Sequence, residues 1–261
     1  PFWFSKNTGS ALPLIALNNS DINIDIEFRD FNEMIKLDNY YKLDDISIKT
    51  DSEFDCKIFT ECIYLDEVEK KKFALMSHEY LIEQVQYNGD DIITKFDSIK
   101  DIFINFRFPI KELFWVISID NTNIDTNLIN DYNNVVKYTT YYSNYKDTFE
   151  SLTIKMNNIT LLEDKPADYY RILQSHLYHN SKRNKYIYSY SFSLNPNQYQ
   201  PSGSINFSNL NNSVFTFKFK NNNNNTSIDS GCATNGIIKI YANNYNILTI
   251  KSGQASLLYV I

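Results

Sequence analysis

Glycine and proline are scarce in this sequence, with 6 of each among 261 residues. Most turns must therefore be made by Asn, Asp and Ser, whose short side chains bond the local backbone and tolerate turn geometry. Cysteine is rarer still: Cys56, Cys62 and Cys232 form no CxxC pair. An odd count without such pairs is typical of a reducing compartment rather than of a disulfide scaffold. We expect three free thiols.

Basic charge and long apolar runs are also lacking. The formal net charge is -6 and the sequence pI is about 5.1, which argues against the basic surface that most nucleic-acid-binding proteins use to contact phosphates. No apolar run approaches the roughly 20 residues that span a bilayer, and no signal-peptide pattern opens the chain. We expect a soluble, intracellular protein. Because an apolar stretch begins directly at Pro1, we also expect a chain cut or processed from a longer protein.

Candidate catalytic and metal-binding residues are few. The histidines are His78, His176 and His179, and the HxxH pair lacks the acidic or cysteine companions of a typical metal site. His78 is better explained as a hydrogen-bonding residue near a helix end. The acidic residues at 66, 67 and 69 favour a solvated helix start over a glycosidase pair. No phosphate-binding glycine loop is present, so we expect no catalytic residue, no metal and no cofactor.

Aromatic residues are abundant, with 20 Tyr and 18 Phe, and aromatics favour strands. The clearest strand pattern is SDINIDIEFRDF at 20–31, where Ile22, Ile24, Ile26 and Phe28 alternate with polar residues. Residues 32–55 are charged and polar and are interpreted as an inter-domain connection.

One short helix is predicted at 65–76, because Asp66 can cap it and Glu69 completes the capping-box spacing. A strand over 78–90 is expected to end in a turn at Asn88-Gly89. Another strand covers 104–118, with Pro109 at a bulge, an edge or a kink.

Residues 119–150 have no clear periodicity and predict a long surface loop. Five further segments have strand character, while the asparagine run at 221–225 is interpreted as a loop tip; the strands lie at 151–156, 186–194, 214–220, 236–250 and 255–261. Many short strands and almost no helix predict an all-β protein with a jelly-roll β-sandwich.

Several blocks, in this order, resemble the major capsid proteins of nucleocytoplasmic large DNA viruses. The most specific is SYSFSLNPNQYQPSGSINFSNL at 189–210. FPIKELFWVI at 108–117 resembles a family strand in which His usually precedes the Pro, a place taken here by Phe108. The segment 156–175 departs from the family pattern. The remaining similar blocks lie at 1–31, 64–86 and 238–261.

The resemblance implies a double jelly-roll protein, of which this chain is the C-terminal part. Residues 1–50 are expected to hold the closing strands of the first jelly roll and a linker, and residues 51–261 the second jelly roll. It also implies a homotrimer that forms pseudo-hexagonal capsomers and contacts neighbouring capsomers, minor capsid proteins and penton proteins. No direct nucleic-acid contact is expected, and proximity to an inner membrane is left open. The implied location is the virion capsid, assembled in the host cytoplasm.

Structural roles are expected for four residues. Trp3 and Trp115 are interpreted as core or inter-domain anchors rather than ligand platforms. Pro201 and Gly203 are expected to make a rigid turn after the strand at 186–194, with a positive φ at Gly203.

Three alternatives to the capsid subunit differ in kind. A scaffold protein of virion assembly would share the double jelly-roll fold but leave the mature particle. A carbohydrate-binding jelly-roll module would show an exposed aromatic platform. A jelly-roll metalloenzyme would bind stoichiometric metal. No specific sequence feature favours either of the last two.

Overall fold

The computed structural model describes residues 2–28, 56–94, 97–119, 147–179, 186–219 and 236–260. They fall into two compact units, one made of residues up to 81 together with 247–260, the other made of residues 82–246. Among these residues, no helix is long and apolar enough to cross a lipid bilayer.

The first unit contains short helical turns and one hairpin. Its small core contains Ala16, Leu17 and Ile250, with Tyr80 and Leu248 packed against them. The backbone N–H of Asn19 donates to the carbonyl of Gly253, 2.9 Å away, so the N-terminal segment is bonded to the turn of the hairpin. The elements are η1 (Trp3–Ser5), η2 (Thr8–Ser10), η3 (Leu14–Ala16), α2 (Glu67–Leu75), the start of β1, the end of β9 (Gly236–Lys251) and β10 (Gln254–Leu257).

The strand predicted at 20–31 is not observed, since residues 20–28 form no strand and the rest lie outside the described residues. Ile22, Ile24, Ile26 and Phe28 are 43–49% exposed. Alternation marks one face for burial, but a strand also requires hydrogen bonds to a neighbouring strand. Among the described residues, this segment pairs with no other strand.

The helix predicted at 65–76 is confirmed as α2. Its start follows from the predicted cap, because Asp66 Oδ1 accepts a 2.8 Å hydrogen bond from the N–H of Glu69. None of its residues is buried, and Val68 is 77% exposed.

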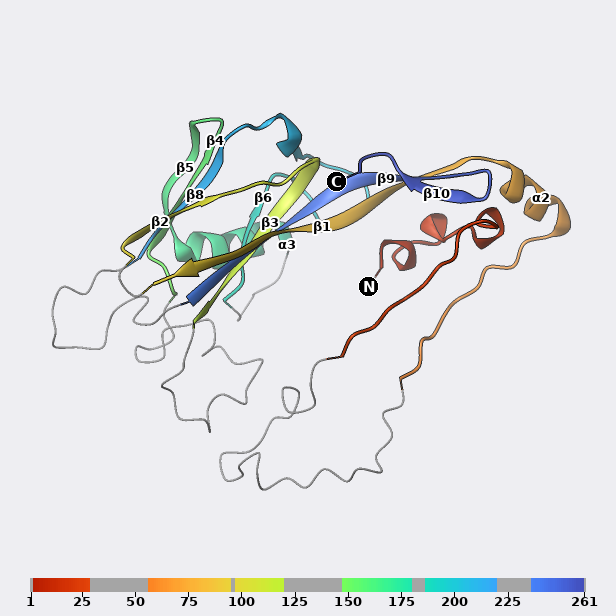
Figure 1. Ribbon diagram of the computed structural model, residues 1–261, viewed down its shortest axis with the longest axis horizontal. Coiled ribbons are helices and arrows are strands. Elements are labelled where there is room, and N and C mark those ends of the chain that lie inside the picture. The colour runs from red at the N-terminus through yellow and green to blue at the C-terminus, as the bar shows by residue number, and fades with distance from the viewer. Residues whose placement is uncertain are drawn as a thin grey trace, which may run out of the picture. The chain divides into compact units, whose positions relative to one another are not determined.

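The second unit is a β-sandwich of two sheets (Figure 1). Sheet A has the order β1-β9-β3-β6, with β7 also paired to β3 and β10 to β9. Sheet B has the order β2-β8-β4-β5. The all-β jelly-roll prediction is thus supported by the strands themselves. Their bounds are β1 (His78–Ile93), β2 (Ile99–Phe103), β3 (Pro109–Ile119), β4 (Ser151–Met156), β5 (Ile159–Pro166), β6 (Tyr188–Ser191), β7 (Ile205–Asn206) and β8 (Ser213–Lys218).

The core lies between the two sheets and is rich in aromatic rings. Along β8 the burial alternates strictly, so that Phe215 and Phe217 are fully buried. Trp115 meets Phe215 edge-on, with ring centroids 5.6 Å apart. The aromatic content noted in the sequence is thus used largely to fill this interior, where large rings bury much apolar area.

The predicted turn at Asn88-Gly89 is wrong, because β1 continues through it to Ile93. Gly89 has a φ of 101°, which glycine accepts without steric penalty. The side chain of Asn88 instead bonds the link between the sheets. Its Nδ2 donates to Phe103 O at 3.0 Å and its Oδ1 accepts from Asn105 N at 2.9 Å.

The link 104–108 connects β2 in sheet B to β3 in sheet A. The prediction placed a strand over these residues, but β3 begins only at Pro109. Gln86 bonds both backbone groups of Arg107, donating to its carbonyl at 2.7 Å and accepting from its N–H at 3.0 Å. Side-chain amides therefore replace the strand ladder along this stretch.

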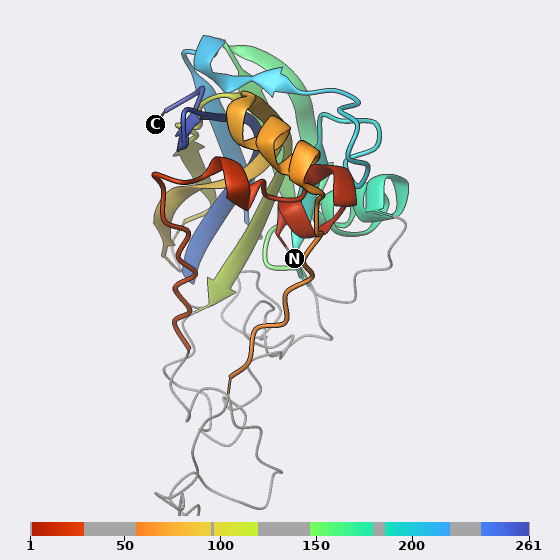
Figure 2. The same ribbon diagram turned by 90° about the vertical axis from the view of Figure 1, so that its right-hand side faces the viewer.

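Helical structure before β6 was not predicted. A π-helix η7 (Tyr169–Leu173) continues into α3 (Gln174–His179), and Figure 2 shows α3 at the periphery of the strands. The predicted loop 119–150 also ends in buried residues, since Thr148 and Phe149 are 0% and 3% exposed. The predicted loop tip at 221–225 and the whole of the predicted connection at 32–55 lie outside the described residues.

Candidate functional site

The two tryptophans occupy different surroundings. Trp115 on β3 is fully buried, and its ring also contacts Tyr170 and Tyr188 at centroid distances of 5.1 and 6.1 Å. Trp3 in η1 is partly buried and contacts Phe4 and Tyr80. Both rings pack against other aromatic side chains.

Pro201 and Gly203 lie in the irregular segment 192–204, which we call the strap. Pro201 is exposed, and Gly203 has a φ of 140°. A Cβ atom at Gly203 would lie 2.8 Å from the carbonyl oxygen of Phe192. The backbones at the two ends of the strap thus approach too closely for a side chain.

A β-bulge in β3 places two charged residues on the same face of sheet A. Between Ile110 and Glu112 the strand advances two residues while β9 advances one, from Asn244 to Asn243. Ile110 and Leu113 both point into the core, so Lys111 and Glu112 between them lie on the opposite, outer face. Both are nonetheless buried, at 2% and 5% exposure.

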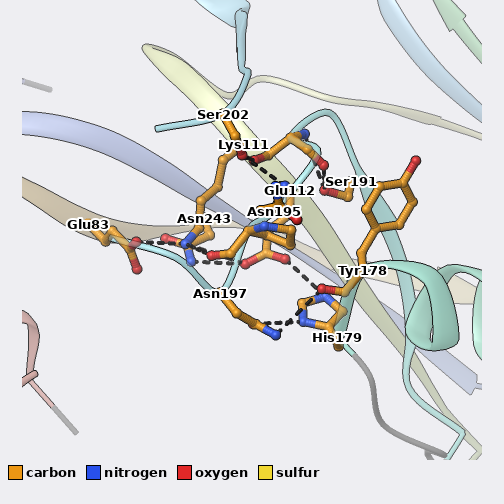
Figure 3. Close-up of polar contacts among 12 residues, drawn as sticks. Glu83, Lys111, Glu112, Tyr178, His179, Ser191, Asn195, Asn197, Ser202 and Asn243 are labelled. Atoms are coloured by element: carbon orange, nitrogen blue, oxygen red, sulfur yellow. Dashed lines mark hydrogen bonds and ion pairs between the residues drawn. The ribbon is translucent and has the colours of Figure 1, made fainter. Parts of the chain in front are cut away.

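Lys111 is held by groups from three parts of the chain (Figure 3). Its Nζ lies 2.7 Å from Glu83 Oε1 on β1 and donates to Pro196 O in the strap at 2.9 Å. Glu112 Oε1 lies 3.8 Å away, and the ring of Tyr245 lies beneath the ammonium at 5.9 Å. A buried ammonium is stable only when its charge is compensated in this way.

Glu112 is contacted from two further sides. Asn243 Nδ2 donates to its Oε1 at 3.2 Å, and His179 Nε2 lies 3.1 Å from its Oε2. The contact with His179 lacks hydrogen-bond geometry, so it is electrostatic and forms an ion pair when the imidazole is protonated. Figure 3 shows His179 between Glu112 and Asn197 of the strap, and its Nδ1 lies 3.1 Å from Asn197 Oδ1.

The strap is closed at its base by its own hydrogen bonds. Ser202 Oγ lies 2.6 Å from Ser193 Oγ and accepts from Asn195 N at 2.8 Å. The N–H groups of Phe192 and Ser193 both donate to Lys111 O, at 2.8 and 3.2 Å. The base and the tip of the strap are therefore fixed by different contacts.

A second charged group lies beside the core at Asp147. Arg171 on η7 binds its carboxylate with two hydrogen bonds of 2.7 and 2.9 Å. Tyr188 Oη donates to Asp147 Oδ1 at 2.9 Å, and the guanidinium lies 4.8 Å from the ring centroid of Tyr186. This bidentate pair fixes η7 against the segment that leads into β4.

Buried tyrosines predict a loss of stability in alkali. Burial raises the pKa of Tyr190 to about 12, and it also raises the pKa of Tyr170 and Tyr188 well above the usual tyrosine value. These pKa values exceed the value of about 10 that tyrosine has in the unfolded chain. The protonated phenols therefore stabilise the fold fully below a pH of about 10, and this stabilisation is lost as the pH rises through the pKa values of the folded protein. We expect the free energy of unfolding to fall steadily above pH of about 10.

Tyrosinate absorbance and circular dichroism, followed together during an alkaline titration, measure this effect. Exposed tyrosines should ionise first, and the buried ones only together with loss of the β-sheet signal. Ionisation of all tyrosines near pH of about 10 in a still-folded protein would contradict the prediction.

The residues weighed as metal ligands or acids lie apart. Among the described residues, no cluster of three or more His, Cys, Asp or Glu could hold a metal ion. His78 begins β1 just beyond the end of α2, with its Nε2 2.7 Å from Phe73 O, so it bonds near a helix end as predicted. Cys56 and Cys62 are free and exposed. Asp66 is a helix cap.

Sequence reasoning missed the polar cluster that includes Lys111. Its charged members are far apart in sequence and look like ordinary surface residues. His179 was judged to lack an acidic companion, yet Glu112 lies 3.1 Å from it. The one usable signal was the adjacent Lys111 and Glu112 inside an apolar strand, which is typical of a bulge.

Comparison with known protein families gives two matches that follow each other along the chain. A model described as large eukaryotic DNA virus major capsid protein matches residues 69–256. A model of the major capsid protein N-terminus matches residues 1–66.

Individual relatives agree with these matches. The major capsid protein of Pyramimonas orientalis virus is 27% identical over 99% of this chain, which spans 59% of that relative. Capsid protein 1 of Acanthamoeba polyphaga mimivirus is 34% identical over 46% of the chain and 20% of the relative. Among solved structures, the PBCV-1 virus capsid matches with a TM-score of 0.61 and 26% identity, over 76% of this chain and 55% of that one.

Proposed function

The chain belongs to the major capsid protein family of large eukaryotic DNA viruses, and we propose that it trimerises into pseudo-hexagonal capsomers. These capsomers would build the icosahedral shell of the virion. The role is structural, with no catalytic step.

The observation that carries the proposal is the sandwich of sheets A and B. It matches the PBCV-1 capsid with a TM-score of 0.61. A jelly roll offers a rigid body with loops at its ends, and such loops can form large contacts between copies without disturbing the core. Closed symmetric assemblies are the usual result when one chain contacts copies of itself.

We further propose the domain arrangement and the partners. Residues 1–50 close the first jelly roll and lead into a linker, and residues 51–261 form the second. The trimer contacts neighbouring capsomers, minor capsid proteins and penton proteins. It makes no direct contact with nucleic acid, in line with a formal net charge of -6. Assembly takes place in the host cytoplasm.

The oligomeric state of the full-length protein tests the first step. We expect native mass spectrometry to give a trimer that persists on dilution, because obligate subunit contacts bury large, partly apolar areas. A full-length protein that stays monomeric under assembly conditions would contradict the proposal.

Purified virus particles separate the capsid role from a scaffold role. We expect peptide mass mapping to find this chain within the most abundant protein of mature particles, and electron microscopy to show pseudo-hexagonal capsomers. Presence in immature particles alone would favour a scaffold that is later removed.

A further inference from the structure

We propose that the strap, residues 192–204, is a detachable element that leaves the outer face of sheet A as a unit, while the sandwich stays folded. Lys111 and His179 act as the latch that sets how often it detaches. The inference concerns the second unit alone and does not depend on the proposed assembly.

The strap keeps its own shape. Ser193 and Ser202 join its two arms through their hydroxyl groups at 2.6 Å. Leu194 N donates to Ser202 O at 3.3 Å, and Gln198 N donates to Asn195 O at 3.2 Å. These bonds lie within the strap and would survive its detachment.

Polar contacts hold the tip of the strap. Lys111 Nζ reaches Pro196 O at 2.9 Å, and His179 Nδ1 lies 3.1 Å from Asn197 Oδ1. At the tip, Leu194 is 71% and Tyr199 43% exposed, whereas Pro196 is buried and Phe192 at the base packs against the core. Beyond the Pro196 ring the tip buries little apolar area, and the apolar contacts that oppose detachment lie mainly at Phe192.

The surface under the tip is incompletely hydrogen-bonded. Three buried atoms there, Glu112 Oε2, His179 Nε2 and Asn243 Oδ1, make no hydrogen bond among the described residues. A partly satisfied polar network in a poorly hydrated place is unfavourable. Opening the strap would let water reach these atoms, which lowers the free energy of opening below that of global unfolding.

The charges define the latch. Lys111 is compensated by Glu83 on β1 and Glu112 on β3, and it adds the carbonyl of Pro196 only when the strap is closed. Removing the Lys111 ammonium takes away the hydrogen bond to Pro196 O, which is the main bond to the tip. It also leaves the carboxylates of Glu83 and Glu112 without this cation. Removing the Asn197 side chain takes away only the strap's contacts with His179 Nδ1 and Tyr178 O and leaves every buried charge in place.

Hydrogen exchange of the whole chain, followed by mass spectrometry, tests the proposal with two variants. We expect Lys111→Met and Asn197→Ala each to speed exchange of the amides of Phe192 and Ser193, which donate to Lys111 O only while the strap is attached, at least about tenfold, with β9 unchanged. The control is Lys218→Met, which removes an exposed lysine paired with Asp164 and should leave strap exchange at the wild-type rate.

Native-state proteolysis supplies a second reading. Chymotrypsin should cut after Tyr199 faster in Asn197→Ala than in the wild type, and the cut chain should keep its β-sheet signal. The proposal is overturned if both variants exchange like the wild type in the strap, or if strap and β9 amides always exchange together. Should Lys111→Met fail to fold, Asn197→Ala alone decides, since it disturbs no buried charge.

Discussion

Replacing Trp115 with alanine is expected to lower the free energy of unfolding by about 3–5 kcal/mol, the range for deleting a large buried aromatic side chain. The indole is fully buried and contacts three aromatic rings, those of Tyr170, Tyr188 and Phe215. Its removal leaves a cavity lined by rigid rings that cannot move in to fill it. Urea unfolding monitored by circular dichroism measures the change.

Two further variants separate packing from other effects. Trp115→Phe should cost much less, because Nε1 of the indole has no hydrogen-bond partner among the described residues and the ring volume is largely kept. Trp3→Ala removes the other, partly buried tryptophan and should leave the unfolding of the sandwich nearly unchanged. Equal losses in Trp115→Ala and Trp3→Ala would show that burial of Trp115 in the core is not the cause.

The second large effect is expected at Gly203, where valine should block folding or assembly of the full-length protein. A positive φ of 140° is disfavoured for any side chain, at a cost of about 1–3 kcal/mol. A Cβ would also lie 2.8 Å from the Phe192 carbonyl, so the two ends of the strap would have to separate. The measurement is the yield of soluble trimer, and an unchanged yield would remove the assignment.

A matched glycine isolates the steric part of this effect. Gly89 also has a positive φ, of 101°, but a Cβ there would meet nothing within 4 Å. Gly89→Ala therefore reports backbone strain alone, while Gly203→Ala reports strain plus overlap. We expect Gly203→Ala to be less stable than Gly89→Ala by about 1–3 kcal/mol, the usual cost of forced overlap. Equal losses of stability in Gly203→Ala and Gly89→Ala would mean that the two ends of the strap can move apart without an energetic cost.

Local signals in the sequence were sufficient for several elements. The α2 helix begins where the Asp66 cap and the Glu69 spacing placed it, because capping depends only on neighbouring residues. The strand over 151–156 was predicted with its observed bounds. The long pattern at 236–250 became β9. In each case the local preference and the final packing agree.

Elements that depend on distant partners were predicted less well. The alternation at 22–28 predicts a strand, but pairing needs a neighbour that no local pattern supplies. Asn88-Gly89 is a strong turn signal, yet the Asn88 amide is bonded to residues 103 and 105. The strap region was the most specific part of the family resemblance, but its attachment depends on Lys111 and His179, which meet only after folding.

The strand order of the two sheets has a consequence for how the chain leaves the ribosome. In sheet A, β9 lies between β1 and β3, and in sheet B, β8 lies between β2 and β4. Both central strands are synthesised later than the strands on either side of them. Neither sheet can close until most of the chain has emerged, and the earlier strands have unpaired edges in the interval. Such long-range pairing makes folding slow and favours premature association between nascent chains, so expression at low temperature or with chaperones should raise the folded fraction.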